Sequence, residues 1–313
     1  KFKNFDEFAM HYANEFKNIE VQNRNVANED YKKQLIEITQ QFYSMPMENI
    51  FSSNKTLQQH NFWIVSEILS EFFAMNPPLM HKYKPELVEW SYSLRPDKSA
   101  EYAYGRRWNE WNQILNTVET LSKRKDSKRA VMPIFMPYDT EPNRKDVPCT
   151  LGYDLQIRNN KIDITTFFRS HDMFKGAKYD NFLSSFMAQI IAMMINAKTN
   201  DDIQPGLLHN YEGSLHVYGK DVQNLEDMLN NNVIENKTFN IMHKYNSIDD
   251  IYNDLLQVLK VEELTYWNNF DIAKQKYDKI ENKSFKDFAA VYYNRNAKYN
   301  NNSTKIQYEG CFK

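Results

Sequence analysis

A thiol, a hydroxyl and a guanidinium occur at spacings that could gather them at one end of a β-hairpin. Residues 147–180 read VPCTLGYDLQIRNNKIDITTFFRSHDMFKGAKYD, with two strand-like runs around Asn159-Asn160. Asparagine tolerates the positive φ angles of a two-residue hairpin turn. If these asparagines form the turn, Cys149 lies opposite Ser170, and Arg169 lies one residue away. The combination predicts a reactive site at the open end of the hairpin.

The cysteine has two interpretations. A lone cysteine is most often a small buried hydrophobe. A nearby cation such as Arg169 favours the thiolate, which is the nucleophilic form, and Pro148 fixes the backbone directly before Cys149. The sequence therefore favours a nucleophilic cysteine presented at the start of a strand.

The same hairpin register divides the side chains between two faces, because successive residues of a strand point to opposite sides. The expected core face consists of Leu151, Tyr153, Leu155, Ile157, Ile162, Ile164, Thr166 and Phe168. The expected solvent face consists of Asp154, Gln156, Arg158, Lys161 and Asp163. This alternation predicts a sheet with a buried face behind the reactive end.

Several motifs, in this order along the chain, together resemble the thymidylate synthase family. They are Ala103-Tyr104-Gly105-Arg106-Arg107-Trp108-x-x-Trp111, Asp126-Ser127-Lys128-Arg129, Pro148-Cys149, Arg169-Ser170-x-Asp172-x-Phe174-x-Gly176 and Gly213-x-x-His216-x-Tyr218. The resemblance implies an α/β (α+β) fold, in which a mixed or antiparallel sheet is flanked by helices. It implies one catalytic domain over residues 1–313, with a divergent helical C-terminal extension from about residue 240.

The resemblance also implies a substrate, a pyrimidine deoxynucleoside monophosphate. Cys149 would be the nucleophile that adds to C6 of the base, and Glu67 would order water and relay protons. The residues implied to bind phosphate and ribose are Arg24, Arg169, Ser170, His216 and Tyr218, together with Lys128 and Arg129 donated by the second subunit of a homodimer. Arg24 could equally be a solvated surface arginine, and a glutamate such as Glu67 is usually a solvated helix residue.

The co-substrate implied by the family is 5,10-methylenetetrahydrofolate. Trp90, Tyr104, Asp172 and Gly176 match positions that contact folate, although aromatic residues on helices are more often core residues. We expect no metal. By comparison with the family, we expect the C-terminal tail to lack the small apolar terminus that thymidylate synthases fold over their active site.

Asp180 departs from the family at the residue that reads the base. Thymidylate synthases place an asparagine eleven residues after the motif arginine, where it pairs with N3–H and O4 of uracil; here that position is Asp180. Cytosine instead offers an N4 donor and an unprotonated N3, which a carboxyl group complements. The substitution resembles phage deoxycytidylate 5-hydroxymethylases. A one-residue shift in alignment would make Asn181 the reader and restore uracil.

Three functions remain open. The first is a dCMP hydroxymethylase, which hydrates the methylene intermediate instead of reducing it. The second is a thymidylate synthase, dUMP hydroxymethylase or dCMP methylase of the same fold. The third belongs to another class, an inactive homologue that binds a nucleotide or a protein.

Composition narrows the setting of these functions. The formal net charge of −2 gives no basic field for a nucleic-acid partner. The 2 cysteines suit a reducing compartment, and the chain contains no long apolar run for a membrane and no leader pattern. We therefore expect a cytoplasmic protein without a membrane partner.

The remaining elements follow from hydrophobic spacing and turn residues. Helices are expected over residues 5–16, 58–74, 114–121, 182–197, 221–229, 248–261 and 285–294. Strands are expected over 131–136 and 207–218 and near Phe239, and a polar loop is expected over 21–25.

Overall fold

The computed structural model describes residues 1–20, 22–25, 32–52, 104–143, 147–230, 238–300 and 305–307. The chain divides into two compact units. The first comprises Lys1–Gln59, Lys125–Ala188 and Gln204–Phe239; the second comprises His60–Arg124, Gln189–Ile203 and Asn240–Lys313. The expectation of a single catalytic domain stays a prediction.

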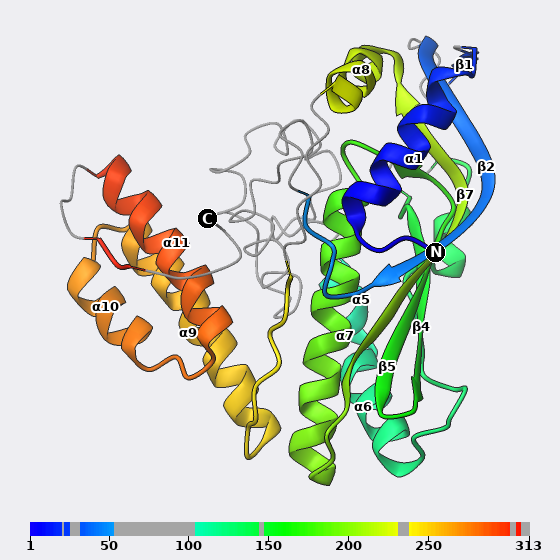
Figure 1. Ribbon diagram of the computed structural model, residues 1–313. Helices are drawn as coiled ribbons and strands as arrows, with labels where there is room; N and C mark the ends of the chain where they lie inside the picture. The colour runs from blue at the N-terminus through cyan, green and yellow to red at the C-terminus, as the bar shows by residue number, and fades with distance from the viewer. Residues whose placement is uncertain are drawn as a thin grey trace. The chain divides into compact units, whose positions relative to one another are not determined.

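A mixed sheet, seven-stranded within the described ranges, dominates the first unit (Figure 1). Its order is β1-β2-β7-β5-β4-β3, with β6 paired to β7. Antiparallel pairs join β2 to β7 and β4 to β5, whereas β5 and β6 run parallel to β7. The strands are β1 Gln22–Asn25, β2 Lys32–Pro46, β3 Val131–Pro133, β4 Thr150–Arg158, β5 Lys161–Phe168, β6 His171–Asp172 and β7 Gln204–Tyr218. This mixed sheet with its helices confirms the predicted α/β class.

The β4–β5 hairpin turns at the predicted residues. Asn159 and Asn160 adopt φ angles of 52° and 55°, which suit a two-residue turn between twisted strands. The predicted register is confirmed from Arg158–Lys161 back to Gly152–Phe167. Every residue of the expected core face is buried except Leu151.

A β-bulge at Leu151 overturns two predictions at the open end of the hairpin. The register shifts between Thr150 and Gly152, so that Thr150 pairs with Phe168. Leu151 points outward and is 38% exposed, because the extra residue of a bulge reverses the alternation. Cys149 consequently lies across from Arg169, not Ser170: Arg169 N donates to Cys149 O at 2.9 Å.

Helix α1 covers part of the sheet and confirms the expected first helix. It spans Phe5–Lys17, and the side chain of Asn4 caps it by accepting from Glu7 N. Phe8 of α1 stacks on Tyr43 of β2, with ring centroids 4.3 Å apart. The apolar stripe read from the sequence is therefore the contact between helix and sheet.

Helix α7, Ala177–Thr199, begins five residues earlier than predicted. Its first turn is set by Asp180 N, which donates to Gly176 O at 3.0 Å. Phe186, Ile190 and Met193 are buried as expected. The early start places Asp180 in the first turn of the helix. Two further elements, η4 (Gly219–Asp221) and α8 (Val222–Asn230), follow β7 and confirm the helix expected there.

The second unit is helical in the part that the structure describes. It contains the part of α7 from Gln189 on, together with α5 Tyr104–Glu110, α6 Gln113–Lys123, α9 Ile248–Tyr266, α10 Phe270–Asp278 and α11 Lys283–Tyr299. Asp254 of α9 joins this helix to the segments before α9 and α11 by accepting from Tyr245 Oη and from the backbone of Glu281 and Asn282. α6, α9 and α11 confirm three expected helices, and α10 was not anticipated. No described helix is both long and apolar enough to cross a membrane.

Two local predictions are wrong. The expected loop at 21–25 contains strand β1, because an edge strand needs only the backbone ladder with β2 and tolerates polar side chains. Phe239 lies in no strand: it is buried, donates from its N–H to Glu48 O and packs on Phe182. Its apolar character reflects that anchoring contact.

Two other strands also differ from expectation: one is shorter than predicted, and one was not predicted. β3 ends at Pro133, where a residue without an N–H interrupts the expected run to 136. β2 was not anticipated at all, although it pairs with β7 from Leu35 to Pro46. The expected helix at 58–74 lies outside the described residues.

Candidate active site

Cys149 lies at the entrance of β4, beside a fixed cation. The residue is exposed and forms no disulfide within the described chain. Arg169 Nε donates to Pro148 O at 2.8 Å, and its Nη2 donates to Val147 O at 2.7 Å. The guanidinium is thus fastened to the segment that ends at Cys149. A fixed positive charge near a cysteine favours the reactive thiolate.

Strand β7 brings His216 and Tyr218 to the same region. Their rings are 5.0 Å apart and nearly perpendicular. Burial and the negative groups Asp172 and Cys149 raise the pKa of the Tyr218 phenol, while Arg169 opposes this rise. The Tyr218 phenol is therefore coupled electrostatically to both the thiol and the guanidinium.

Burial lowers the pKa of His216, so this residue is a neutral hydrogen-bonding group at neutral pH. It pairs in register with Asp172 of β6. Gly213 of the same strand lets the chain pass close to Arg169, because a Cβ there would meet Arg169 O at 3.0 Å. The motif glycine therefore positions the arginine.

Asp172 has one committed and one uncommitted oxygen. Its Oδ1 accepts from the backbone N–H groups of Phe174 and Lys175 at 2.8 Å each. Its Oδ2 is buried and has no hydrogen-bond partner within the described residues. An unsatisfied buried acceptor is costly, and a hydrogen bond from a ligand would remove that cost.

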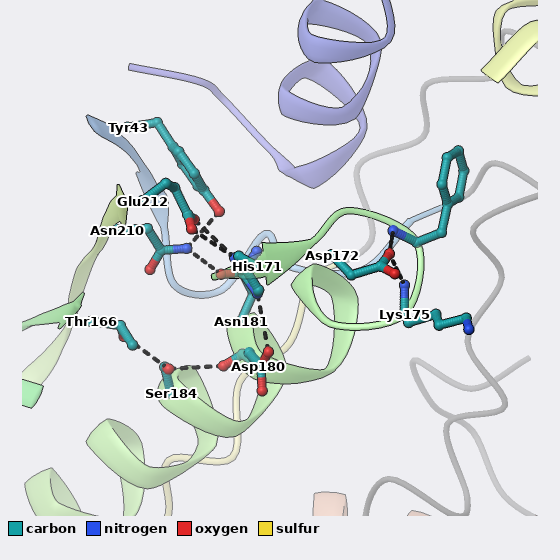
Figure 2. A network of polar contacts seen from close by, with 11 residues as sticks. Tyr43, Thr166, His171, Asp172, Lys175, Asp180, Asn181, Ser184, Asn210 and Glu212 are labelled. Carbon is teal, nitrogen blue, oxygen red and sulfur yellow. Dashed lines mark hydrogen bonds and ion pairs between the residues drawn. The ribbon is translucent and has the colours of Figure 1, made fainter. Parts of the chain in front are cut away.

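Asp180 belongs to a buried polar network, drawn in Figure 2. Its Oδ2 lies 3.0 Å from His171 Nε2, and His171 Nδ1 lies 2.9 Å from Glu212 Oε1. His171 and Glu212 are almost fully buried, whereas the Asp180 side chain is 23% exposed. Asp180 is therefore the member of the chain of contacts that reaches solvent.

Asn181, the alternative base reader, faces the core. Its side chain is fully buried, and its Oδ1 accepts from Asn210 Nδ2 at 2.5 Å (Figure 2). Asn210 also donates to Tyr43 Oη at 2.6 Å. Because the Asn181 side chain is fully buried whereas the Asp180 side chain is 23% exposed, the arrangement favours Asp180 as the residue offered to a ligand.

His171 and Glu212 were missed by the sequence analysis. His171 fills a position of the Arg169-Ser170-x-Asp172 motif that carries no expectation, and its contact with Glu212 crosses 41 residues. One signal was available for Glu212. Strand alternation puts Asn210 and Glu212 on the buried face with Leu208, and polar residues on a buried face need partners.

Comparison with known proteins identifies the family. The family model described as thymidylate synthase matches residues 12–268. A Methanosarcina acetivorans protein, named provisionally as a thymidylate synthase, is 31% identical over 167 residues, covering 51% of this chain and 71% of the relative. A Mycoplasma mobile protein named thymidylate synthase is 22% identical over 162 residues, covering 51% of this chain and 54% of the relative.

The chain belongs to the thymidylate synthase family. The resemblance inferred from the motifs is confirmed. Thymidylate synthase family members are transferases that use methylenetetrahydrofolate and bind a pyrimidine nucleotide, and this protein is a folate-dependent transferase of that kind. Within the described ranges, no group of three or more His, Cys, Asp or Glu side chains is arranged to hold a metal ion.

The structure brings together one group of the residues expected from thymidylate synthase resemblance. This group belongs to the first unit and lies at or near the ends of β4, β5, β6 and β7 or the start of α7. Its members are Cys149, Arg169, Ser170, Asp172, Gly176, Asp180, His216 and Tyr218. The buried Asp172 Oδ2 fits the hydrogen-bonding needs of a pterin. The absence of a side chain at Gly176 also leaves room for the Asp180 carboxyl group, since a Cβ there would lie 3.2 Å from Asp180 Oδ2.

The remaining expected residues belong to other segments of the chain. Lys128 and Arg129 are exposed in the segment before β3. Tyr104 begins α5 in the second unit. Arg24 belongs to strand β1, and the structure describes its backbone but not its side chain. Glu67 and Trp90 are not among the described residues.

Proposed function

We propose that the protein is a dCMP hydroxymethylase, which transfers a one-carbon unit from 5,10-methylenetetrahydrofolate to C5 of deoxycytidine monophosphate and adds water to give 5-hydroxymethyl-dCMP. One observation carries the choice of cytosine: the part-exposed base reader is a carboxylate, Asp180, anchored through its Oδ2 to His171. A carboxylate accepts from the N4 amino group of cytosine, whereas it would face the O4 acceptor of uracil.

Cys149 supplies the nucleophile in this proposal. C5 of cytosine is too weak a nucleophile to attack the folate methylene unaided. Addition of the Cys149 thiolate to C6 breaks the conjugation of the ring and makes C5 enamine-like. The Arg169 guanidinium, bonded to the carbonyls of Val147 and Pro148, supports the thiolate electrostatically.

The remaining residues bind the two substrates. We assign the phosphate to Arg169, Arg24 and Ser170 of one subunit and to Lys128 and Arg129 of the partner subunit. His216 and Tyr218 are assigned to the ribose hydroxyl, which suits their adjacent rings on β7. Folate is assigned to Asp172, Gly176, Trp90 and Tyr104, and Glu67 is assigned to the water and proton relay.

A homodimer is supported by an aromatic stripe on the sheet. The stripe consists of Phe42 on β2, Tyr211 on β7 and Phe167 on β5, which are 54%, 50% and 37% exposed. Tyr211 is the register partner of both phenylalanines. A contiguous exposed aromatic surface favours burial against another molecule, and a second copy offers a matching face. We place the reaction in the cytoplasm, which suits an exposed thiol nucleophile.

Product analysis decides between the candidate reactions. The protein is incubated with dCMP or dUMP and 5,10-methylenetetrahydrofolate, and the nucleotide product is weighed by mass spectrometry. Hydroxymethyl-dCMP supports the proposal. Thymidylate, hydroxymethyl-dUMP or methyl-dCMP would each establish an alternative within the family, and absence of product with retained nucleotide binding would establish an inactive homologue.

A further inference from the structure

His171 lies between two carboxylates, with each ring nitrogen facing one of them (Figure 2). Nδ1 is 2.9 and 3.0 Å from the two oxygens of Glu212, and Nε2 is 3.0 Å from Asp180 Oδ2. A neutral imidazole has only one N–H, so it could donate to only one of these partners. Two donations require the doubly protonated imidazolium.

The surroundings hold this ring in place. The face of His171 stacks on Phe168, with centroids 3.8 Å apart and planes inclined by 10°. Burial alone would lower the pKa of His171, but Glu212 and Asp180 together raise it to about 10. A cation stacked on an aromatic face and bonded to two carboxylates is satisfied in the interior.

The other titratable groups near the cluster come from neighbouring elements. Tyr43 on β2 and Tyr12 on α1 stay neutral phenols, because burial and Glu212 raise the pKa of both. His216 on β7 senses the charge of His171, and burial keeps it neutral. Glu212, His171 and Asp180 thus share a single net negative charge when no base is bound.

Both the backbone and the carboxyl group of Asp180 have a partner. Its backbone oxygen accepts from Ser184 Oγ at 2.8 Å, and Ser184 Oγ in turn lies 3.0 Å from Thr166 Oγ1. Gly176 leaves room for the contact between His171 and Asp180, since a Cβ there would lie 3.0 Å from His171 Cδ2. The backbone contact fixes the residue that carries the carboxyl group, and the space at Gly176 admits the contact between Oδ2 and His171.

We propose that His171 and Glu212 are positioning residues for base recognition: as an imidazolium backed by Glu212, His171 holds Asp180 as a carboxylate acceptor, so that the enzyme binds cytosine protonated at N3. This inference rests on the proposed function. Neutral cytosine would place the N3 lone pair against the Asp180 carboxylate. A proton taken up from solvent onto N3 converts that contact into a charge-assisted hydrogen bond and neutralises the net charge of the cluster.

Protonation at N3 also prepares the base for the thiolate. When Cys149 Sγ bonds to C6, the C5–C6 π pair moves to C4–C5, and the C4–N3 π pair moves onto N3. The positive charge of N3 and the negative charge of sulfur disappear together. The adduct is a neutral enamine whose C5 is nucleophilic.

Calorimetry of the native protein tests the proton directly. Titration with dCMP near neutral pH, in buffers of different ionisation enthalpy, is expected to reveal uptake of about one proton per site. Titration with dUMP is expected to reveal no such uptake. Binding of dCMP without proton uptake would overturn the inference. This measurement needs no variant and therefore does not depend on a mutant folding correctly.

A glutamine at position 171 tests the role of the charge. His171→Gln keeps an N–H donor but loses the cation, and we expect the ratio of kcat/KM for dCMP to that for dUMP to fall at least about tenfold. The matched control is His243→Gln, since His243 also faces a glutamate, Glu281, but lies in the second unit. The control is expected to keep the native ratio.

The outcomes separate the two proposals. If the native enzyme does not prefer dCMP, the proposed function fails. If it prefers dCMP but His171→Gln retains that preference within about threefold, the assignment of His171 fails while the proposed function stands. If His171→Gln does not fold, Glu212→Gln replaces it; that variant keeps a hydrogen-bond acceptor and removes one anion from the imidazolium. The dCMP preference of Glu212→Gln is then expected to weaken as the pH rises, and a preference that does not change with pH would overturn the inference.

Discussion

Arg169 lies directly across from Cys149 at the open end of the β4–β5 hairpin, with its backbone nitrogen 2.9 Å from the Cys149 carbonyl oxygen. Its guanidinium returns to the same strand through Pro148 O and Val147 O. The arginine therefore constrains the backbone that carries the thiol as well as providing a charge beside it. In the proposed function, this one side chain both supports the thiol and binds the phosphate.

Cys149→Ser is expected to abolish turnover and to keep nucleotide binding within about threefold of native. Serine lacks a low-energy anionic form without a dedicated base, whereas the phosphate and ribose contacts do not involve the thiol. Single-turnover product formation and calorimetric binding of dCMP measure the two effects. Product formed at the native rate by this variant would assign the nucleophile to another residue.

Asp180→Asn is expected to move the substrate preference from dCMP toward dUMP. The native enzyme is expected to favour dCMP by at least about tenfold in kcat/KM, equivalent to roughly 1.4 kcal/mol. An asparagine amide can accept from N3–H and donate to O4 of uracil. Asp271→Asn, an exposed change on α10, is the matched control. Steady-state rates on both nucleotides measure the preference. An unchanged ratio of kcat/KM for dCMP to that for dUMP in Asp180→Asn would show that Asp180 does not read the base.

Mixed dimers test whether subunits share active sites. A Cys149→Ala subunit combined with an equal amount of an Arg129→Ala subunit is expected to recover about a quarter of native activity, because about half of the dimers are mixed and each mixed dimer has one intact site of two. Each variant alone is expected to be nearly inactive. Mixed dimers as inactive as the parents would show that Arg129 does not act across the interface.

The aromatic stripe gives an independent test of the dimer. Tyr211→Glu places a charge at the centre of this surface and is expected to produce monomers in sedimentation experiments. Trp267→Glu changes a more exposed aromatic residue, 65% exposed and directly after α9, and is expected to leave the association state unchanged. If Tyr211→Glu remains a dimer, the interface does not include the aromatic stripe.

Stability should depend on pH through His171. Its pKa is raised from 6.5 to about 10 in the folded protein, so its contribution to stability is fully present below pH 6.5 and is lost as the pH rises toward 10. The difference in urea midpoint between the native protein and His171→Gln is therefore expected to shrink over this interval. A difference that stays constant with pH would contradict a charged His171.

The sequence alone determined the features that depend on short-range chemistry. The Asn159-Asn160 turn follows from the tolerance of asparagine for positive φ, and the apolar spacing of α1 follows from its contact with the sheet. The motif order also determined the family. These signals are local, or repeat with the period of a helix or strand, and no tertiary contact competes with them.

Tertiary structure decided the details of the site. The bulge at Leu151 depends on how β4 fits between its neighbours: a Cβ on Gly152 would meet Met132 O of β3 at 2.9 Å. Sequence alternation cannot register an extra residue of this kind, so it paired Cys149 with the wrong partner. The polar edge strand β1 was likewise hidden, because its stability comes from the backbone of β2.

The contact between His171 and Glu212 depended most on the fold. The two residues are 41 positions apart and meet because β6 lies parallel to β7. Asp180 joins them only because α7 begins at Ala177 rather than near 182. The sequence could indicate a carboxyl group at position 180, but the histidine beside it and the second carboxyl group, Glu212, were brought there by strand pairing, which no spacing of residues encodes.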